Sequence, residues 1–235
     1  HPSTNSNIGS CSAIDSIESV RLLLQDLRDA GYVLAHIPAD RQEFIDELIA
    51  GATNDRDYMS EKQIDNADAK LLVSAYRDYY KTLPEKVQQR LEQDWGEAPG
   101  DVFFYDDFLL IPGMMNGNIF ITMQPPRGFG EDPDKIYHSP DCAPTHHYLG
   151  FYHWLRDIWG ADAMMHIGTH GSLEWLPGKG VAMGDECYPD ICTGDLPNVY
   201  PYWVVDTGGG IQAQRRSGAC LISYLSAPLS ISGVY

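Results

Sequence analysis

Glycine and proline interrupt the segment from Met165 to Lys179, which also carries two histidines and a glutamate. His166, His170 and Glu174 are spaced four residues apart, so on a continuous helix they would share one face. The two glycines between them disfavour such a helix, because each costs about 1 kcal/mol relative to alanine. We therefore expect a strand that ends at His166, a turn that carries His170 and a short helix that carries Glu174.

These side chains suit a site that handles a metal ion and moves protons. Neutral imidazole binds borderline divalent metals and also accepts protons, and a nearby carboxylate can orient the imidazole or take a proton itself. We predict His166, His170 and Glu174 as catalytic residues, with His166 and His170 as metal ligands. His146, near the start of a predicted helix over 145–159, is a weaker candidate ligand. The alternative is that these histidines only bind the backbone and stabilise the turn.

Capped helix signals alternate with short apolar runs in the first fifty residues. Asp15 and Glu18 form a capping-box pattern before a helical apolar repeat that Gly31 ends. The apolar run 32–37 predicts a strand, and Asp40 opens a second helix that ends at Gly51. Alternation of strand and helix is typical of an α/β domain with a parallel sheet.

The rest of the chain extends this pattern. Residues 52–100 predict a helical excursion within one α/β domain, with helices over 67–82 and from Pro84 to about 95. Further strands are expected over 117–123, 163–167 and 202–205. Ligands of open parallel sheets bind beyond the carboxyl ends of strands, so the turn after His166 and the loop 125–133 are expected to share one face. The predicted class is a Rossmann-like, three-layer α/β domain with a parallel sheet and a helical insertion.

Composition excludes several classes of function. The chain has 33 acidic and 16 basic residues and a formal net charge of −17, which argues against binding to nucleic acid phosphates. It has no apolar run near the roughly 18–20 residues of a membrane span. Its five cysteines are odd in number and lack a C-x-x-C pair, which indicates reduced thiols and a cytoplasmic location. A polar start at His1 predicts an internal fragment of a longer protein.

Two further motifs point to weaker alternatives. Pro177 to Gly180 imitates the end of a Walker A loop but lacks its first glycine and its Ser or Thr, so no nucleotide is predicted there. Residues 208–213 fit G-x-G-x-x-A, a weak signal for a dinucleotide-dependent oxidoreductase. A glycine turn there, with Arg215 and Arg216, would also suit an anion. A zinc hydrolase built on the two histidines and the glutamate is a further alternative.

Taken together, several segments resemble the large subunit shared by aerobic cobaltochelatase and magnesium chelatase. The similarity covers most of the chain, is densest over about 116–186, and is carried by Asn7–Ser10, Gly117–Phe120, Met123–Pro133, Ile136–His138, Pro144–His146, His166–Lys179 and Gln212–Arg216. The form of the segment from Leu173 to Lys179 is nearer to the cobalt branch.

The resemblance implies a metal chelatase, a ligase that forms nitrogen–metal bonds. Its substrates would be a divalent metal, Co²⁺ or Mg²⁺, and a tetrapyrrole such as hydrogenobyrinate diamide or a protoporphyrin-like ring. It also implies an AAA+ ATPase partner that hydrolyses the ATP, a metal-adhesion-type partner subunit, and an isolated fragment that is inactive. A tetrapyrrole-binding module without chemistry of its own remains an alternative. The residues expected to contact the macrocycle are Arg127, Tyr137, Trp175, Lys179, Arg215 and Arg216.

Overall fold

A computed structural model of the chain describes residues 8, 14–56, 59–128, 141–168, 171–203 and 207–224. Two helices begin the described chain, and a helical region with one strand follows. These elements are α1 (Ser16–Asp29), α2 (Arg41–Ala50), α3 (Glu61–Asp65), β1 (Ala69–Leu72), α4 (Val73–Tyr80) and α5 (Glu85–Trp95). Four short strands come next, namely β2 (Phe104–Tyr105), β3 (Phe108–Ile111), β4 (Met114–Asn116) and β5 (Ile119–Ile121).

The second half holds the longest buried helical segment and a parallel sheet. The elements are α7 (His146–His153), the π-helix η3 (Trp154–Ile158), β6 (Met164–Met165), the 3-10 helix η4 (Leu173–Trp175), α8 (Tyr188–Thr193), β7 (Asn198–Trp203), α9 (Thr207–Arg216) and β8 (Cys220–Tyr224). The strands β6, β7 and β8 form a parallel sheet in the order β6-β7-β8, which we call sheet C. Two antiparallel sheets complete the described fold, with the orders β1-β3-β2 and β4-β5.

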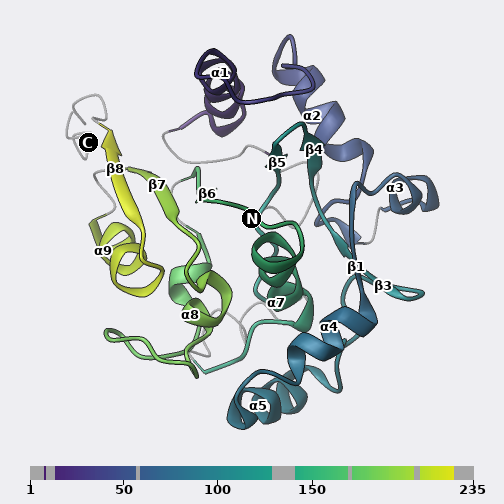
Figure 1. Ribbon diagram of the computed structural model, residues 1–235, viewed down its shortest axis with the longest axis vertical. Helices are drawn as coiled ribbons and strands as arrows, with labels where there is room; N and C mark the ends of the chain where they lie inside the picture. Colours follow the sequence, from purple (N-terminus) through teal and green to yellow (C-terminus); the bar gives the residue numbers. More distant parts are fainter. Residues whose placement is uncertain are drawn as a thin grey trace, which may run out of the picture.

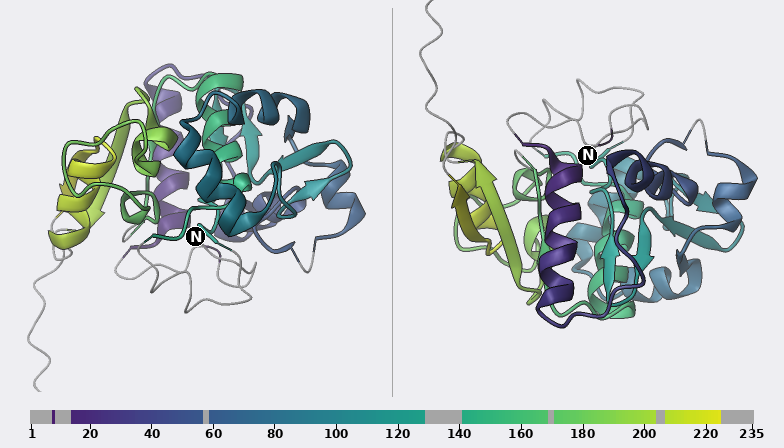
Figure 2. Two further views of the ribbon diagram at one scale, coloured as in Figure 1. Left: turned by 90° about the horizontal axis from the view of Figure 1, so that it is seen from below. Right: turned by 90° about the horizontal axis from the view of Figure 1, so that it is seen from above.

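Helix α7 occupies the centre of the molecule, and the other elements surround it (Figure 1). Every residue of α7 is buried. Sheet C lies on one side together with α8 and α9, while α4 and α5 lie on the other (Figures 1 and 2). The main hydrophobic core therefore forms around α7, from Leu71 and Tyr76 to Leu173 and Cys192. A second hydrophobic cluster joins α1 and α2 to Met114.

Local capping signals explain where the predicted helices begin. The side chain of Asp15 accepts a hydrogen bond from the Glu18 N–H, that of Asp40 binds the first turn of α2, and that of Thr145 binds the Tyr148 N–H. Gly160 ends the helical segment of α7 and η3 with a φ of 75°. Because each cap satisfies N–H groups that have no partner inside the helix, these three starting points were predictable from sequence. The predicted mixture of helices and sheets, with a parallel sheet, is confirmed, whereas the Rossmann-like three-layer arrangement stays a prediction.

Two predicted elements are wrong. Residues 32–37 form no strand, because the side chain of Asn116 binds the N–H groups of Ala35 and His36 and the carbonyl group of His36. The predicted helix over 67–82 is divided into β1 and α4, because Ala69–Leu72 pairs with β3. The region 52–100 therefore contains a sheet strand as well as helices. That this region is a helical excursion within one α/β domain stays a prediction.

The predicted strand over 117–123 is shorter in the structure and lies outside the parallel sheet. Only Ile119–Ile121 is a strand, and it forms an antiparallel hairpin with β4. The hairpin turns at Gly117, whose φ is 63° and whose added Cβ would lie 2.3 Å from the Val33 carbonyl oxygen. Glycine is the residue that tolerates both this conformation and this close approach.

Candidate active site

His166 follows directly after β6 and is held from both ends of its ring. Its backbone N–H donates to the Val199 carbonyl oxygen at 2.9 Å, which extends the pairing of β6 with β7. Its Nδ1 lies 2.9 Å from Asn198 Oδ1, and its Nε2 lies 3.4 Å from the Tyr152 hydroxyl. The ring is half-buried. The predicted position of His166 at a strand end is confirmed.

Glu174 lies in the short helix η4, as the sequence predicted, and its side chain is buried. Its Oε1 accepts hydrogen bonds from the Gly171 N–H at 3.0 Å and from the Tyr200 hydroxyl at 3.3 Å. The Tyr200 ring in turn lies edge-on to the His166 ring, with centroids 6.0 Å apart. Tyr200 therefore contacts both His166 and Glu174, and the fold brings these two predicted residues together.

Gln124 connects the His166 side of the site to the loop before η4. Its Nε2 donates to the Tyr152 hydroxyl at 2.7 Å, and its Oε1 accepts from the Ser172 N–H at 2.7 Å and from the Ser172 hydroxyl at 3.1 Å. A Cβ on Gly171 would lie 3.1 Å from Gln124 Oε1 and 3.2 Å from Glu174 Oε2. Glycine at 171 thus lets both the Gln124 amide and the Glu174 carboxylate approach the backbone closely.

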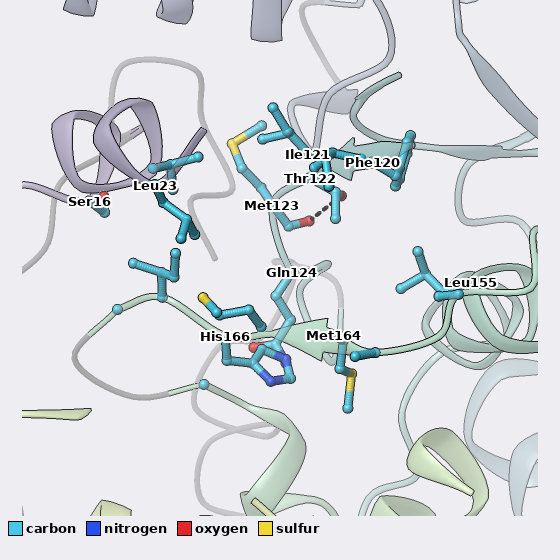
Figure 3. Close-up of a pocket in the computed structure, with 18 of the residues that line it drawn as sticks. Ser16, Leu23, Phe120, Ile121, Thr122, Met123, Gln124, Leu155, Met164 and His166 are labelled. Atoms are coloured by element: carbon cyan, nitrogen blue, oxygen red, sulfur yellow. Dashed lines mark hydrogen bonds between the residues drawn. The ribbon is translucent and has the colours of Figure 1, made fainter. Parts of the chain in front are cut away.

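An apolar cleft of about 600 Å³ borders this polar network. One wall comes from α1 and α2, and the other from β5, β6 and the end of α7, with Gln124, Tyr152 and His166 at the polar end. Figure 3 shows the side chains of Gln124 and His166 next to each other, with Met123 and Leu23 across the open space. The volume lies within the roughly 300–1,000 Å³ of small-molecule and cofactor sites. The cleft can therefore hold a large, mainly apolar ligand against His166.

Two of the predicted arginines bind backbone carbonyl groups of the loop that carries Glu174. Arg127 donates to the Trp175 carbonyl oxygen at 3.0 Å, and Arg216 donates to the Leu176 carbonyl oxygen at 2.6 Å. Burial lowers the pKa of Arg216 from its ordinary value. These contacts indicate that both guanidinium groups hold the loop in place. Direct contact of either group with a ligand stays a prediction.

The other predicted ligand-contacting residues are on the surface or outside the described chain. Trp175, Lys179 and Arg215 are exposed. His170 and Tyr137 lie outside the described residues, so their predicted roles are untested.

His146 does not have the free ring nitrogen that a metal ligand needs. Its Nδ1 lies 2.8 Å from the Tyr76 hydroxyl, and its Nε2 lies 2.9 Å from the Gly96 carbonyl oxygen. Burial lowers the pKa of His146. The geometry therefore favours a neutral, structural histidine over the weak metal-ligand prediction.

The glycines 208–210 lie in the first turn of α9 and not in a turn before it, whereas Arg215 and Arg216 lie in its last turn. At 1.5 Å rise per residue, the helix separates the two sets of backbone atoms by roughly 10 Å along its axis. A shared anion site there stays a prediction.

The described part of the chain lacks two features. Within it, no three His, Cys, Asp or Glu side chains are grouped so that they could hold a metal ion. No helix in the described ranges combines the length and apolar composition that a membrane crossing requires.

The fold and the site define a protein of mixed helices and sheets with a half-buried histidine at the polar end of an apolar cleft. Residues 1–235 match the model of the CobN/Magnesium Chelatase family, and the chain belongs to that family. It is 39% identical over 235 residues to the aerobic cobaltochelatase subunit CobN of Pseudomonas aeruginosa, and covers 19% of that protein. It is 34% identical over 234 residues to the chloroplastic magnesium-chelatase subunit ChlH of Oryza sativa, and covers 16% of it. Each match includes 100% of this chain.

A solved structure supports the fold. The catalytic subunit of cobaltochelatase from Mycobacterium tuberculosis superposes with a TM-score of 0.80 at 38% sequence identity. The match covers 92% of this chain and 19% of that one. The chain thus spans about a fifth of the length of these relatives.

The structure adds polar residues that the sequence analysis missed. Gln124, Tyr152, Asn198 and Tyr200 come from three separate parts of the chain, because Asn198 and Tyr200 both lie in β7. Of these four, Gln124 alone lay in a segment that the sequence analysis had singled out, namely Met123–Pro133.

Proposed function

We propose that this chain forms part of the catalytic large subunit of a chelatase that inserts a divalent metal into a tetrapyrrole. Cobalt is favoured over magnesium because identity to the cobaltochelatase subunit, 39%, exceeds identity to the magnesium-chelatase subunit, 34%. ATP would be hydrolysed by an AAA+ partner, acting with a metal-adhesion-type subunit, since the motif at Pro177–Gly180 departs from a Walker A loop. The observation that carries the proposal is the place of His166 in the lining of the apolar cleft, with the buried Glu174 connected to it through Tyr200.

Metal insertion removes two protons from the pyrrole nitrogens of the macrocycle. His166 presents Nε2 near the cleft and can accept one of them or bind the incoming metal. Glu174 is the second proton acceptor, and its hydrogen bonds from Gly171 and Tyr200 fix the direction of its carboxylate. The predicted roles of His170 as a further ligand and base, and of Tyr137 as a macrocycle contact, belong to this proposal.

The surface residues near η4 complete the proposed site. Trp175, which is 45% exposed, offers an aromatic face to the flat ring. Lys179 and Arg215 are exposed cations that suit the carboxylate or amide groups at the edge of the macrocycle. Arg127 and Arg216 would act mainly by holding the loop on which Glu174 lies.

Substitution of the two proton acceptors tests the proposal. We expect His166→Gln and Glu174→Gln to lower metal insertion by about 100-fold or more, the range for loss of a general acid or base. The assay uses the full-length protein with its ATPase partners. His36→Gln is the matched control, because His36 pairs with Glu47 and lies outside the cleft lining.

Binding is measured separately from insertion. Quenching of porphyrin fluorescence should persist in both glutamine variants, since neither substitution removes the apolar walls of the cleft. Normal insertion by His166→Gln and Glu174→Gln would contradict the proposal. Quenching by the chain together with normal insertion in both variants would instead identify it as a binding module.

A further inference from the structure

We propose that Asn198 is a positioning residue that fixes His166 as the Nδ1–H tautomer, so that Nε2 is its basic nitrogen. The consequence for metal insertion rests on the proposed function, whereas the tautomer itself is a property of the chain alone. The proposal follows from the order of donors and acceptors in the hydrogen bonds on both sides of the imidazole.

The first step is the orientation of the Asn198 amide. Its Nδ2 lies 3.3 Å from the Ser217 carbonyl oxygen and 3.2 Å from the Ser217 hydroxyl oxygen. The Ser217 hydroxyl donates its own hydrogen to the Ala213 carbonyl oxygen at 2.8 Å. A carbonyl oxygen only accepts, so the NH₂ group of Asn198 must face Ser217. Both side chains are about 4% exposed, so water does not compete for these bonds.

The second step fixes the proton on His166. With its NH₂ group turned to Ser217, Asn198 presents Oδ1 to His166 Nδ1 at 2.9 Å. An amide oxygen has no hydrogen to donate, so Nδ1 must carry one. In a neutral imidazole the other nitrogen then has the free lone pair. Nε2 is therefore the atom that can accept a proton or a metal.

The third step concerns the groups near Nε2. The backbone N–H of Ser172 donates to Gln124 Oε1, so Gln124 turns its NH₂ group to the Tyr152 hydroxyl oxygen. The Tyr152 hydroxyl can then donate its own hydrogen to His166 Nε2. Burial raises the pKa of Tyr152, which keeps this hydroxyl protonated. The groups near Nε2 are thus compatible with Nε2 as the acceptor, and the Asn198 side assigns it.

The 3.4 Å separation of Tyr152 and His166 is long for a hydrogen bond, whose usual range for such groups ends near 3.2 Å. A stronger partner from the cleft can therefore replace Tyr152 at Nε2 with little loss. Gln124 and Asn198 are amides and do not take up protons near neutral pH. Neither amide can therefore take a proton from the imidazole.

Nitrogen NMR of the full chain labelled with ¹⁵N-histidine measures the tautomer directly. The His166 signals are assigned by their loss in His166→Gln. Above the titration range, we expect a pyrrole-type signal at Nδ1 and a pyridine-type signal at Nε2, with an excess of the Nδ1–H form of about tenfold, which corresponds to about 1.4 kcal/mol and lies within the range of one buried hydrogen bond. A predominant Nε2–H form in the unsubstituted chain would overturn the proposal.

Three variants separate the effect of Asn198 from general disturbance of the site. Asn198→Leu removes the acceptor at similar volume and should make the Nε2–H form predominant. Tyr152→Phe removes the partner of Nε2 and should leave the Nδ1–H signature unchanged. Asn198→Asp keeps an acceptor and should retain the Nδ1–H form, because a carboxylate oxygen has no hydrogen to donate to Nδ1.

These outcomes decide the proposal even where one variant fails to fold. Persistence of the Nδ1–H form in Asn198→Leu, or its loss in Asn198→Asp, would contradict a positioning role. The spectra need neither tetrapyrrole nor partner subunits, so failure of the chelatase assay would leave the tautomer result intact. Conversely, if the spectra showed mainly the Nε2–H form, the insertion assay would still test the role of His166 independently.

Discussion

Acid should destabilise this fold through His147, a histidine buried in α7. Its Nε2–H donates to the Leu110 carbonyl oxygen at 2.7 Å, and no described residue offers a hydrogen-bond partner to its Nδ1. Burial lowers the pKa of His147 from 6.5 to about 4. The unfolded chain therefore binds a proton more readily than the folded chain, and the free energy of unfolding falls as pH falls below about 6.5.

The difference in the pKa of His147 between the two states corresponds to about 3 kcal/mol in total. About 2 kcal/mol of it is lost between pH 7 and pH 5, because the folded state begins to bind the proton only near pH 4. Burial also lowers the pKa values of His146 and His153, which adds losses of the same sign.

Replacement of His147 by glutamine isolates its contribution. The amide can still donate to the Leu110 carbonyl oxygen but does not titrate. Denaturant unfolding of both proteins at several pH values from 7 to 5 gives the free energies. We expect the original chain to lose about 2 kcal/mol more than His147→Gln over this range. Parallel pH profiles would refute the assignment of a neutral, buried His147.

Two further pairs of substitutions test the local packing. Gly117→Ala should lower the free energy of unfolding by about 2 kcal/mol or more, because its Cβ would overlap the Val33 carbonyl group. Gly96→Ala, with a φ of 79° and nothing within 4 Å of the added Cβ, should show only the backbone strain of about 1 kcal/mol. Equal losses of the two variants in chemical denaturation would contradict the overlap. Arg216→Met should cost about 1.5–3 kcal/mol through its lost hydrogen bond, while the exposed Arg215→Met should stay within about 0.5 kcal/mol. Matching thermal unfolding curves for the two methionine variants would contradict the inference that Arg216 holds the loop of Glu174 in place.

Helix starts were predictable because their causes lie within four residues of chain. Asp15, Asp40 and Thr145 each bind N–H groups of the next turn, so no distant partner is needed. The segments 32–37 and 67–72 were misassigned because their partners are far away in sequence. Asn116 takes the backbone bonds of the first, and β3 pairs with the second.

The same distinction applies to the candidate site. The positions of His166 and Glu174 were predictable because Gly168 and Gly171 in the sequence between them disfavour a continuous helix. Asn198 and Tyr152 reach His166 from positions 32 and 14 residues away. Nothing in the local spacing of the chain marks such partners. Pairing of β7 with β6 brings Asn198 to His166, and the position of α7 brings Tyr152.

Strand β5 also limits how this chain can change length. Ile119 and Ile121 pack against the cluster of α1 and α2, whereas Phe120, between them, packs against the core around α7. Successive side chains of a strand point to opposite faces, so one inserted or deleted residue would exchange these neighbours. A single insertion or deletion in β5 would therefore disturb the packing of both walls of the cleft. We expect related sequences to carry their insertions and deletions outside β5.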